Sequence, residues 1–294
     1  MEFLDSSSVA SYKSLLVKML GDLTEICEKY NLHYYCACGT LLGAIRHKGF
    51  IPWDDDIDIY MPREDYMKMI NLSNQNELGD YKVISMQNHS GGVAFAKFWN
   101  TRTTLWEIEE VHFVYGVYID IFPLDATNET KEQFLRNYRR RRLVNSIYQL
   151  SQMHFSLSAL NSRIKQGDRK FIIKDLLSLF VPNYLSKYIR KKLICLDEKG
   201  NESNGSFLVS YYGDYGEKEY FKKEWFADYK MADFESLKVR IPCEYDSYLR
   251  QLYGNYMELP PIEKRITHHY HYYLNLNKHL TIEQVKEIKK ISEI

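Results

Sequence analysis

IPWDDDIDIY, residues 51–60, places four aspartates within five positions, directly before an alternating apolar stretch. From Asp56 onward polar and apolar residues alternate, so the pattern predicts a strand with Ile57 and Ile59 facing the core. Side chains two positions apart leave the same face of a strand, and Asp56 and Asp58 are therefore expected to project together. Because like charges so close together repel one another, the stretch also predicts a bound cation.

Paired carboxylates that hold Mg²⁺ or Mn²⁺ are typical of enzymes that transfer phosphoryl groups. A second predicted strand, residues 116–122, carries Asp120 between apolar neighbours. We predict that Asp56, Asp58 and Asp120 are metal ligands and catalytic residues, and Asp120 is also suited to act as the base for an incoming hydroxyl. The alternative is a solvated acidic loop.

A calcium-binding EF-hand loop does not fit the same residues. Counted from Asp54, the sixth position is Ile59, where that loop needs glycine, and the twelfth is Asp65 in place of glutamate. The chain also lacks both spacings typical of structural zinc sites, the one with two cysteines and two histidines and the one with four cysteines. A hard divalent cation therefore remains the predicted cofactor.

Gly39-Thr40 occupies a predicted turn between a strand and a helix, shortly before the acidic run. Backbone N–H groups, the helix dipole and the Thr40 hydroxyl can hold a phosphate there, and Arg46 on the following helix can neutralise it. The other candidate substrate-binding residues are Lys97, Arg102, Lys264, Arg265 and His268. Arg46 and Lys97 each have an ordinary alternative, a surface charge and an edge-strand lysine respectively.

Hydrophobic spacing predicts an α+β chain of three segments. Residues 1–128 combine helices over 8–30, 41–46 and 62–70 with strands at 33–38, 56–60, 81–86, 93–99, 103–107 and 116–122. Residues 129–204 are helical by pattern, and residues 205–294 return to short strands with helices over 245–252 and from Thr281. We expect the first segment to be the catalytic core and the third to complete the active site.

The chain of 294 residues carries 39 Lys and Arg against 39 Asp and Glu, so no net charge favours nucleic acid as a partner. Five cysteines in mostly apolar surroundings favour a reducing compartment, and no export leader or bilayer-spanning run is recognisable. The sequence therefore predicts a cytoplasmic protein. For the run Arg139–Arg142 a solvated helix surface is favoured, and a peripheral contact with the inner face of the membrane or with a glycolipid phosphate is the alternative.

Two motifs, CGTLLGAIR at 38–46 and IPWDDDID at 51–58, resemble the signature of the LicD family. Further segments agree in the same order, namely TRTT at 101–104, YIDIFPLD at 118–125, LYGNYM at 252–257 and LPPIEKR at 259–265, followed by His268. The similarity is sparse between about 129 and 205. Asn255 departs from the aspartate often found at that position, and the zinc-finger insertion of the distant relatives fukutin and fukutin-related protein is not recognisable.

The resemblance implies a nucleotidyltransferase-like fold, with a mixed β-sheet core, flanking helices and a helical insertion. It also implies transfer of phosphocholine or a related phospho-alcohol from a CDP-activated alcohol to a hydroxyl of a surface glycan, lipid-linked glycan or teichoic acid precursor, releasing CMP. On the matched motifs, Gly39 and Thr40 take the phosphate-binding turn, Asp56 and Asp58 the metal pair, and Asp120 the third acidic position. Two alternatives stay open: a nucleotidyltransferase that uses an NTP and releases pyrophosphate, and a non-catalytic protein that binds a glycan or nucleotide.

Overall fold

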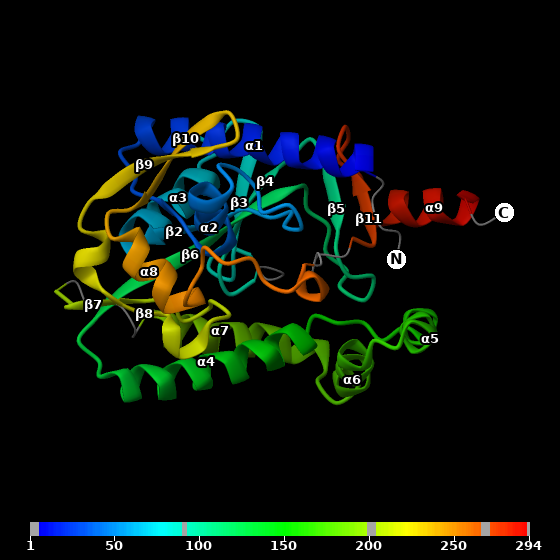
Figure 1. Ribbon diagram of the computed structural model, residues 1–294. Coiled ribbons are helices and arrows are strands. Elements are labelled where there is room, and N and C mark those ends of the chain that lie inside the picture. The colour runs from blue at the N-terminus through cyan, green and yellow to red at the C-terminus, as the bar shows by residue number, and fades with distance from the viewer. Residues whose placement is uncertain (1–5, 90–92, 199–203, 266–270, 293–294) are drawn as a thin grey trace.

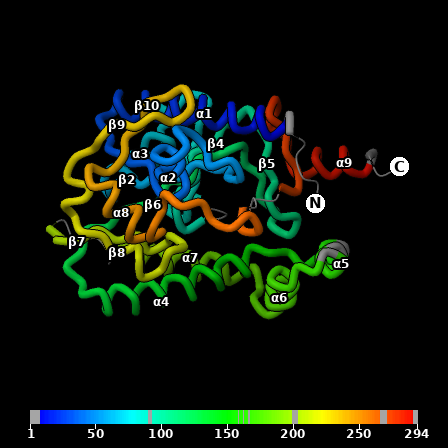
Figure 2. Tube along the Cα trace, in the orientation of Figure 1, coloured from blue at the N-terminus to red at the C-terminus, as the bar shows by residue number. Residues whose placement is uncertain are grey.

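A computed structural model gives the fold of the protein and describes residues 6–89, 93–198, 204–265 and 271–292. Figure 1 shows a mixed sheet with its surrounding helices and, beside it, a separate layer of helices formed by residues 131–198. The tube in Figure 2 shows that the chain leaves the sheet once to build this layer and then returns to it. The predicted α+β class is confirmed.

The main sheet has the strand order β1-β2-β6-β4-β3, and β7 and β8 extend it from β6. Its strands are β1 (Tyr35–Cys36), β2 (Asp58–Pro62), β3 (Tyr81–Ile84), β4 (Ala96–Asn100), β6 (Tyr118–Thr127), β7 (Phe207–Val209) and β8 (Tyr220–Lys222). Only β2 and β6 run parallel among the paired strands of this part of the structure. Because β7 and β8 come from the third predicted segment, residues 205–294 contribute directly to the sheet that holds the aspartates.

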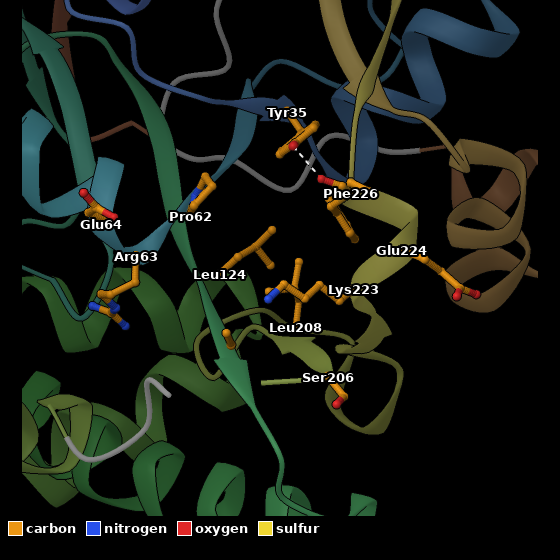
Figure 3. A pocket seen from close by; sticks show the side chains of 12 residues that line it. Tyr35, Pro62, Arg63, Glu64, Leu124, Ser206, Leu208, Lys223, Glu224 and Phe226 are labelled. Carbon is orange, nitrogen blue, oxygen red and sulfur yellow. Dashed lines mark hydrogen bonds between the residues drawn. The ribbon is translucent and has the colours of Figure 1, made fainter. Parts of the chain in front are cut away.

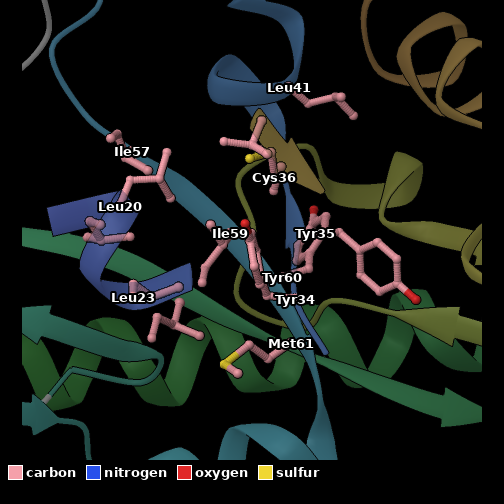
Figure 4. Packing of buried hydrophobic residues seen from close by; sticks show 14 of the residues in the cluster. Leu20, Leu23, Tyr34, Tyr35, Cys36, Leu41, Ile57, Ile59, Tyr60 and Met61 are labelled. Carbon is pink, nitrogen blue, oxygen red and sulfur yellow. The ribbon is translucent and has the colours of Figure 1, made fainter. Parts of the chain in front are cut away.

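The helices around the sheet bury apolar side chains spaced three and four residues apart. They are α1 (Ser6–Lys29), α2 (Cys38–Arg46), α3 (Arg63–Asn74), α8 (Tyr245–Tyr253) and α9 (Ile282–Ser292). Figure 4 shows Leu20 and Leu23 of α1 packed beside Ile57 and Ile59, the two apolar residues predicted to face the core. Full burial of such side chains supplies about 1.5–3 kcal/mol each, so the alternation in the acidic stretch fixes which way its carboxylates point.

The acidic strand is shorter than predicted. β2 begins at Asp58, and Asp56 lies in the preceding loop. Regular pairing with β6 starts where the Asp120 N–H donates to the Ile57 carbonyl over 2.9 Å, whereas the Asp58 N–H donates to the Thr40 hydroxyl, not to another strand. A hydrogen bond to a side chain in place of a neighbouring strand marks the end of a strand. Only Asp58 therefore lies on the strand, and the prediction that Asp56 projects from the same strand face is wrong.

Two small antiparallel sheets complete the fold. β9 (Tyr229–Phe234) pairs with β10 (Leu237–Pro242), and β5 (Thr104–Trp106) pairs with β11 (Tyr273–Asn275). The β9–β10 hairpin packs on α1, β1 and α2, as Figure 1 shows. The last part of the chain thereby covers the elements that come first.

The helical layer consists of α4 (Lys131–Leu150), α5 (Leu157–Gln166), α6 (Arg169–Ser178) and α7 (Ser186–Glu198). A capping box between Thr130 and Gln133 starts α4. In the predicted arginine run the side chains diverge: Arg141 is buried with its guanidinium 3.6 Å from the centre of the Tyr211 ring, while its three neighbours are exposed. In the described part of the chain, no helix has the length and apolar composition to cross a membrane.

Two arginines, each between two buried carboxylates, hold the helical layer against the sheet. Arg63 at the start of α3 pairs with Asp125 of β6 and Asp197 of α7, with N···O distances of 2.7 Å to both. Arg163 of α5 pairs with Glu110, in the connection after β5, at 2.6 Å and with Asp175 of α6 at 3.4 Å. Because all four carboxylates are buried, loss of either arginine would leave buried charges unpaired.

Candidate active site

Asp58 and Asp120 are register partners on the two parallel strands, so their side chains leave the sheet side by side. Asp58 is half-buried and lies beside Asp56, Asp120 and Asp54, and this burial and repulsion raise its carboxyl pKa well above the ordinary value. Lys97 opposes the shift. Negative charge is thus concentrated at the point where β2 begins.

The N-terminus of α2 is tied directly to Asp58. The Ala37 N–H donates to the Asp58 carbonyl over 2.9 Å, and the Asp58 N–H donates to the Thr40 hydroxyl over 2.8 Å. A Cβ atom on Gly39 would come within 2.4 Å of the Asp54 carboxylate, so only glycine lets the acidic loop approach the helix end this closely. The predicted Gly39-Thr40 turn is therefore the first turn of α2, packed against the acidic run.

Thr40→Val should lower stability as well as donor binding. The threonine is buried, and valine keeps its shape but leaves the Asp58 N–H without its acceptor, a loss of about 1–3 kcal/mol. Thr40→Ser keeps the hydroxyl and serves as the control. Urea unfolding should separate the two variants; equal stability of Thr40→Val and Thr40→Ser would mean that this hydrogen bond contributes nothing.

Lys97 of β4 neutralises part of the negative charge of the acidic group, which we define as Asp54, Asp56, Asp58 and Asp120. Its Nζ lies 3.2 Å from Asp120 Oδ1, 3.9 Å from Glu107 Oε2 and 3.2 Å from the centre of the Tyr118 ring. The hydroxyls of Tyr115 and Tyr118 donate to Glu107. Lys97 was singled out in the sequence because it interrupts an apolar strand, and the structure places it beside Asp120. The contacts of Glu107 and the two tyrosines were not predicted.

Tyr12 of α1 is buried next to the acidic group. Burial raises the pKa of its hydroxyl well above the usual value, and the nearby charges of Asp55, Glu107, Asp56 and Asp120 add to the effect. Its position in the helical pattern predicts only a core residue. Its proximity to four carboxylates comes from the way α1 crosses the sheet, which local pattern does not encode.

Two of the predicted substrate-binding cations hold the C-terminal loop in place. Arg46 donates to the carbonyls of Tyr256 over 2.7 Å and Glu258 over 3.2 Å. Arg265 donates to the Pro260 carbonyl over 2.9 Å, and its guanidinium lies 5.4 Å from the centre of the Trp53 ring. These contacts bring residues 256–265 next to α2 and the acidic loop.

The remaining predicted cations are less closely connected to the aspartates. Lys264 is exposed at the end of the short helix Ile262–Lys264. Arg102 is exposed and pairs with Asp80 at 2.8 Å, in a hollow shared with Lys18 of α1. His268 lies outside the described residues.

A chain of buried hydrogen bonds supports the α2 turn from below. The Cys38 N–H donates to the Tyr248 hydroxyl over 3.1 Å, Tyr248 donates to Tyr60 over 3.4 Å, and Tyr60 donates to Glu219 Oε2 over 2.8 Å. Cys38 has a φ of 44°, an uncommon value for a residue with a side chain. Burial raises the pKa of Glu219 to about 7. Nothing in the local sequence around Glu219 predicts this role.

Glu219→Gln should flatten the pH dependence of stability. Since the pKa of Glu219 is raised from 4.5 to about 7 in the folded protein, the folded state holds a proton that the unfolded chain releases. Stability therefore falls as pH rises through this interval, and the glutamine variant lacks that contribution. Denaturant unfolding of both proteins across this range measures the difference; parallel curves would contradict the assignment.

Two tyrosine rings lie close to the same turn. The hydroxyls of Tyr215 and Tyr253 are 2.6 Å apart, and the rings meet edge to face with centres 5.3 Å apart. Burial raises the pKa of Tyr215, and the charges of Cys38 and Asp58 add to this shift. Tyr253 belongs to the motif LYGNYM at 252–257, and the structure brings Tyr215 beside it.

The residues of this site fit a divalent cation that is coordinated by two carboxylates. Crowding of negative charge at Asp58, with Asp120 as its neighbour in register, is the situation that a cation relieves. Among the described residues, no three Asp, Glu, His or Cys side chains are grouped so that they could hold a metal ion. Mg²⁺ commonly takes one or two protein carboxylates and completes its shell with phosphate and water, so the pair suffices.

A cavity of about 730 Å³ lies elsewhere, at the opposite end of β2. Figure 3 shows Tyr35, Leu124, Leu208 and Phe226 around it, with the Tyr35 hydroxyl donating to the Phe226 carbonyl over 2.7 Å. Its lining includes Pro62, where β2 ends, whereas Asp58 begins that strand. The acidic group and the cavity are thus separate features.

The chain is similar to a family of known proteins. Residues 31–160 match the family described as LicD/FKTN/FKRP, nucleotidyltransferase domain. The chain is 30% identical over 253 residues to the lipopolysaccharide cholinephosphotransferase LicD of Haemophilus influenzae, covering 83% of this chain and 89% of that protein. An uncharacterized protein of Rickettsia prowazekii is 41% identical over 68 residues, which is 23% of this chain and 26% of that protein.

The family match includes the α2 turn, the acidic loop and both paired strands. The matched family model describes a nucleotidyltransferase domain, and a sheet with two aspartates side by side next to a helix N-terminus agrees with that class. The chain belongs to the LicD family. This membership supports a transferase activity.

Proposed function

We propose that the protein transfers phosphocholine, or a related phospho-alcohol, from a CDP-activated donor to a hydroxyl of a surface glycan, lipid-linked glycan or teichoic acid precursor, releasing CMP. The observation that carries the proposal is the register pairing of Asp58 with Asp120 directly beside the start of α2. The similarity to a lipopolysaccharide cholinephosphotransferase supports the choice of reaction.

Each residue has a role that its contacts suit. A bound Mg²⁺ or Mn²⁺ would neutralise charge on the diphosphate, and the register pair Asp58 and Asp120 would hold it, with the charge of Asp56 nearby in the loop. Lys97 keeps Asp120 in place and balances its charge when the substrate is absent. The first turn of α2, which contains Gly39 and Thr40, would direct N–H groups and the positive end of the helix dipole toward an incoming phosphate.

The aromatic residues favour choline as the alcohol. The Tyr215 and Tyr253 rings lie edge to face, which leaves ring surface for a quaternary ammonium, and each such contact contributes about 0.5–2 kcal/mol. A hydroxylated alcohol such as ribitol would instead need hydrogen bonds, which the two tyrosine hydroxyls could also provide. Choline is therefore our first choice and a polyol the second.

The product nucleotide tests the proposal. Incubation with CDP-choline, CDP-ribitol or CDP-glycerol and a glycan acceptor should release CMP from at least one donor, and CTP should yield no pyrophosphate. Chromatography of the nucleotides measures both. Acceptor-dependent pyrophosphate release from CTP, with all three CDP-alcohols inert, would identify a nucleotidyltransferase, while donor binding without any product would leave a binding protein.

A further inference from the structure

We propose that α6 docks the protein onto the surface of an anionic lipid bilayer. The relevant surface, which we call the α6 face, consists of Ile173, Leu176 and Leu177 of α6 and of Phe180 in the turn that follows it. Their exposed fractions are 57%, 45%, 47% and 81%. The spacing of these residues is that of an apolar stripe which a helix ordinarily buries against a core.

The outward direction of the α6 face is fixed by the other side of the helix. Asp175 and Ser178 are buried, and Asp175 pairs with Arg163 of α5, which also pairs with Glu110. Figures 1 and 2 show α5 and α6 together at one end of the helical layer. α6 therefore cannot turn its apolar stripe inward without breaking a buried ion cluster.

Positive charge surrounds the exposed apolar residues. Although the whole chain is neutral, residues 131–198 contain 15 Lys and Arg against 5 Asp and Glu. Arg169, Lys170 and Lys174 are exposed on α6 itself, alongside the apolar stripe. Apolar side chains flanked by basic ones are the composition of helices that lie in the interface of a bilayer containing anionic lipids.

Exposed aromatic residues follow α6 in the chain. Tyr184 and Tyr188 are 80% and 70% exposed. Tyrosine rings favour the headgroup region of a bilayer, where the ring is partly buried and the hydroxyl stays in water. On α5, Leu157 and Ile164 are also exposed.

The same charges argue against a second copy of this chain as the occupant. A symmetric dimer through the α6 face would bring Arg169, Lys170 and Lys174 of both copies into one interface, which concentrates positive charge there. A spanning mode is also excluded for α6, because its ten residues are half of the roughly 20 needed to cross a bilayer. An anionic bilayer surface can bury the apolar side chains of the α6 face and bind the basic side chains beside it.

Vesicle co-sedimentation of the full chain tests the proposal, using vesicles of phosphatidylcholine alone and mixed with phosphatidylglycerol. The wild type should bind the mixed vesicles much more strongly, and added salt should weaken this binding. The double substitution Leu177→Ser with Phe180→Ser should lower the partition coefficient on the order of tenfold or more, because it removes two inserted side chains. Lys170→Glu with Lys174→Glu should lower it to a similar degree.

The matched control combines Met231→Ser and Lys82→Glu, an exposed apolar and an exposed basic residue on β9 and β3. It should bind as the wild type does, and circular dichroism should show all variants folded. Absence of vesicle binding by the wild type, equal binding to both vesicle types, or undiminished binding by the α6 variants would overturn the proposal. So would a dimer, seen by analytical ultracentrifugation, that the Leu177 and Phe180 substitutions dissociate while vesicle binding persists.

Discussion

Asp58→Asn is expected to abolish nearly all turnover while leaving the fold intact. If Asp58 holds the cation that stabilises several kcal/mol of charge in the transition state, the rate should fall on the order of 10³-fold. Asp56→Ala and Asp58→Ala should behave in the same way. The measurement is CMP release with saturating donor and Mg²⁺, alongside thermal unfolding in EDTA.

Stability should move in the opposite direction from activity. Because burial and the adjacent carboxylates raise the pKa of Asp58, the folded protein retains a proton there that the unfolded chain loses, and stability falls as pH rises past the ordinary aspartate pKa. Asparagine removes this loss, so Asp58→Asn without metal should be at least as stable as the wild type at neutral pH. Asp55→Asn makes the same charge change in the loop directly before β2 and serves as the control. Wild-type turnover in Asp58→Asn, or turnover indifferent to EDTA, would refute a metal site here.

Arg63→Met is expected to cause the largest loss of stability. Methionine leaves Asp125 and Asp197 buried without their cation, which costs about 3–5 kcal/mol. A protein of this kind has only about 5–15 kcal/mol of total stability. Urea unfolding should therefore show a strongly lowered midpoint.

The control for this prediction is Arg142→Met, since Arg142 is exposed and lies 3.5 Å from the exposed Asp214. A surface pair of this kind contributes about 0–1 kcal/mol. Combining Arg63→Met with Asp197→Asn should restore part of the loss, because one of the two unpaired charges is then gone. If Arg63→Met were no more destabilising than Arg142→Met, the helical layer would not depend on this ion cluster.

Elements whose pattern is local were predicted well. The helix over 8–30, the short helix after Thr40 and the terminal helix from 281 all form where spacing and caps indicated. The helical character of 131–198 is confirmed for the same reason. By contrast, β6 continues to Thr127, five residues past its predicted end at 122, because β7 pairs with its final residues.

The site was predictable only in part, because some of its contacts join distant segments. The acidic run and Asp120 stand out by composition, and their pairing follows from two strands with the same alternation. Arg46 carries a charge that suits phosphate, yet its contacts are carbonyls about 210 positions further along the chain. Glu219 resembles any surface glutamate until the tertiary fold buries it beneath Tyr60. The division of the chain into three segments and the roles of the substrate-binding residues stay predictions.

Tyr60 and Glu219 are 159 positions apart in the chain. At about 5–20 residues per second, a ribosome needs roughly 8–30 s to make the intervening segment. During that time β2 can pair with β6, but Tyr60 lacks the aromatic rings of Phe221, Phe226 and Tyr248 that surround it in the finished molecule. The nascent chain therefore carries the acidic strand with one apolar face uncovered, so a premature stop between 128 and 205 would yield an aggregation-prone polypeptide and not a smaller working enzyme.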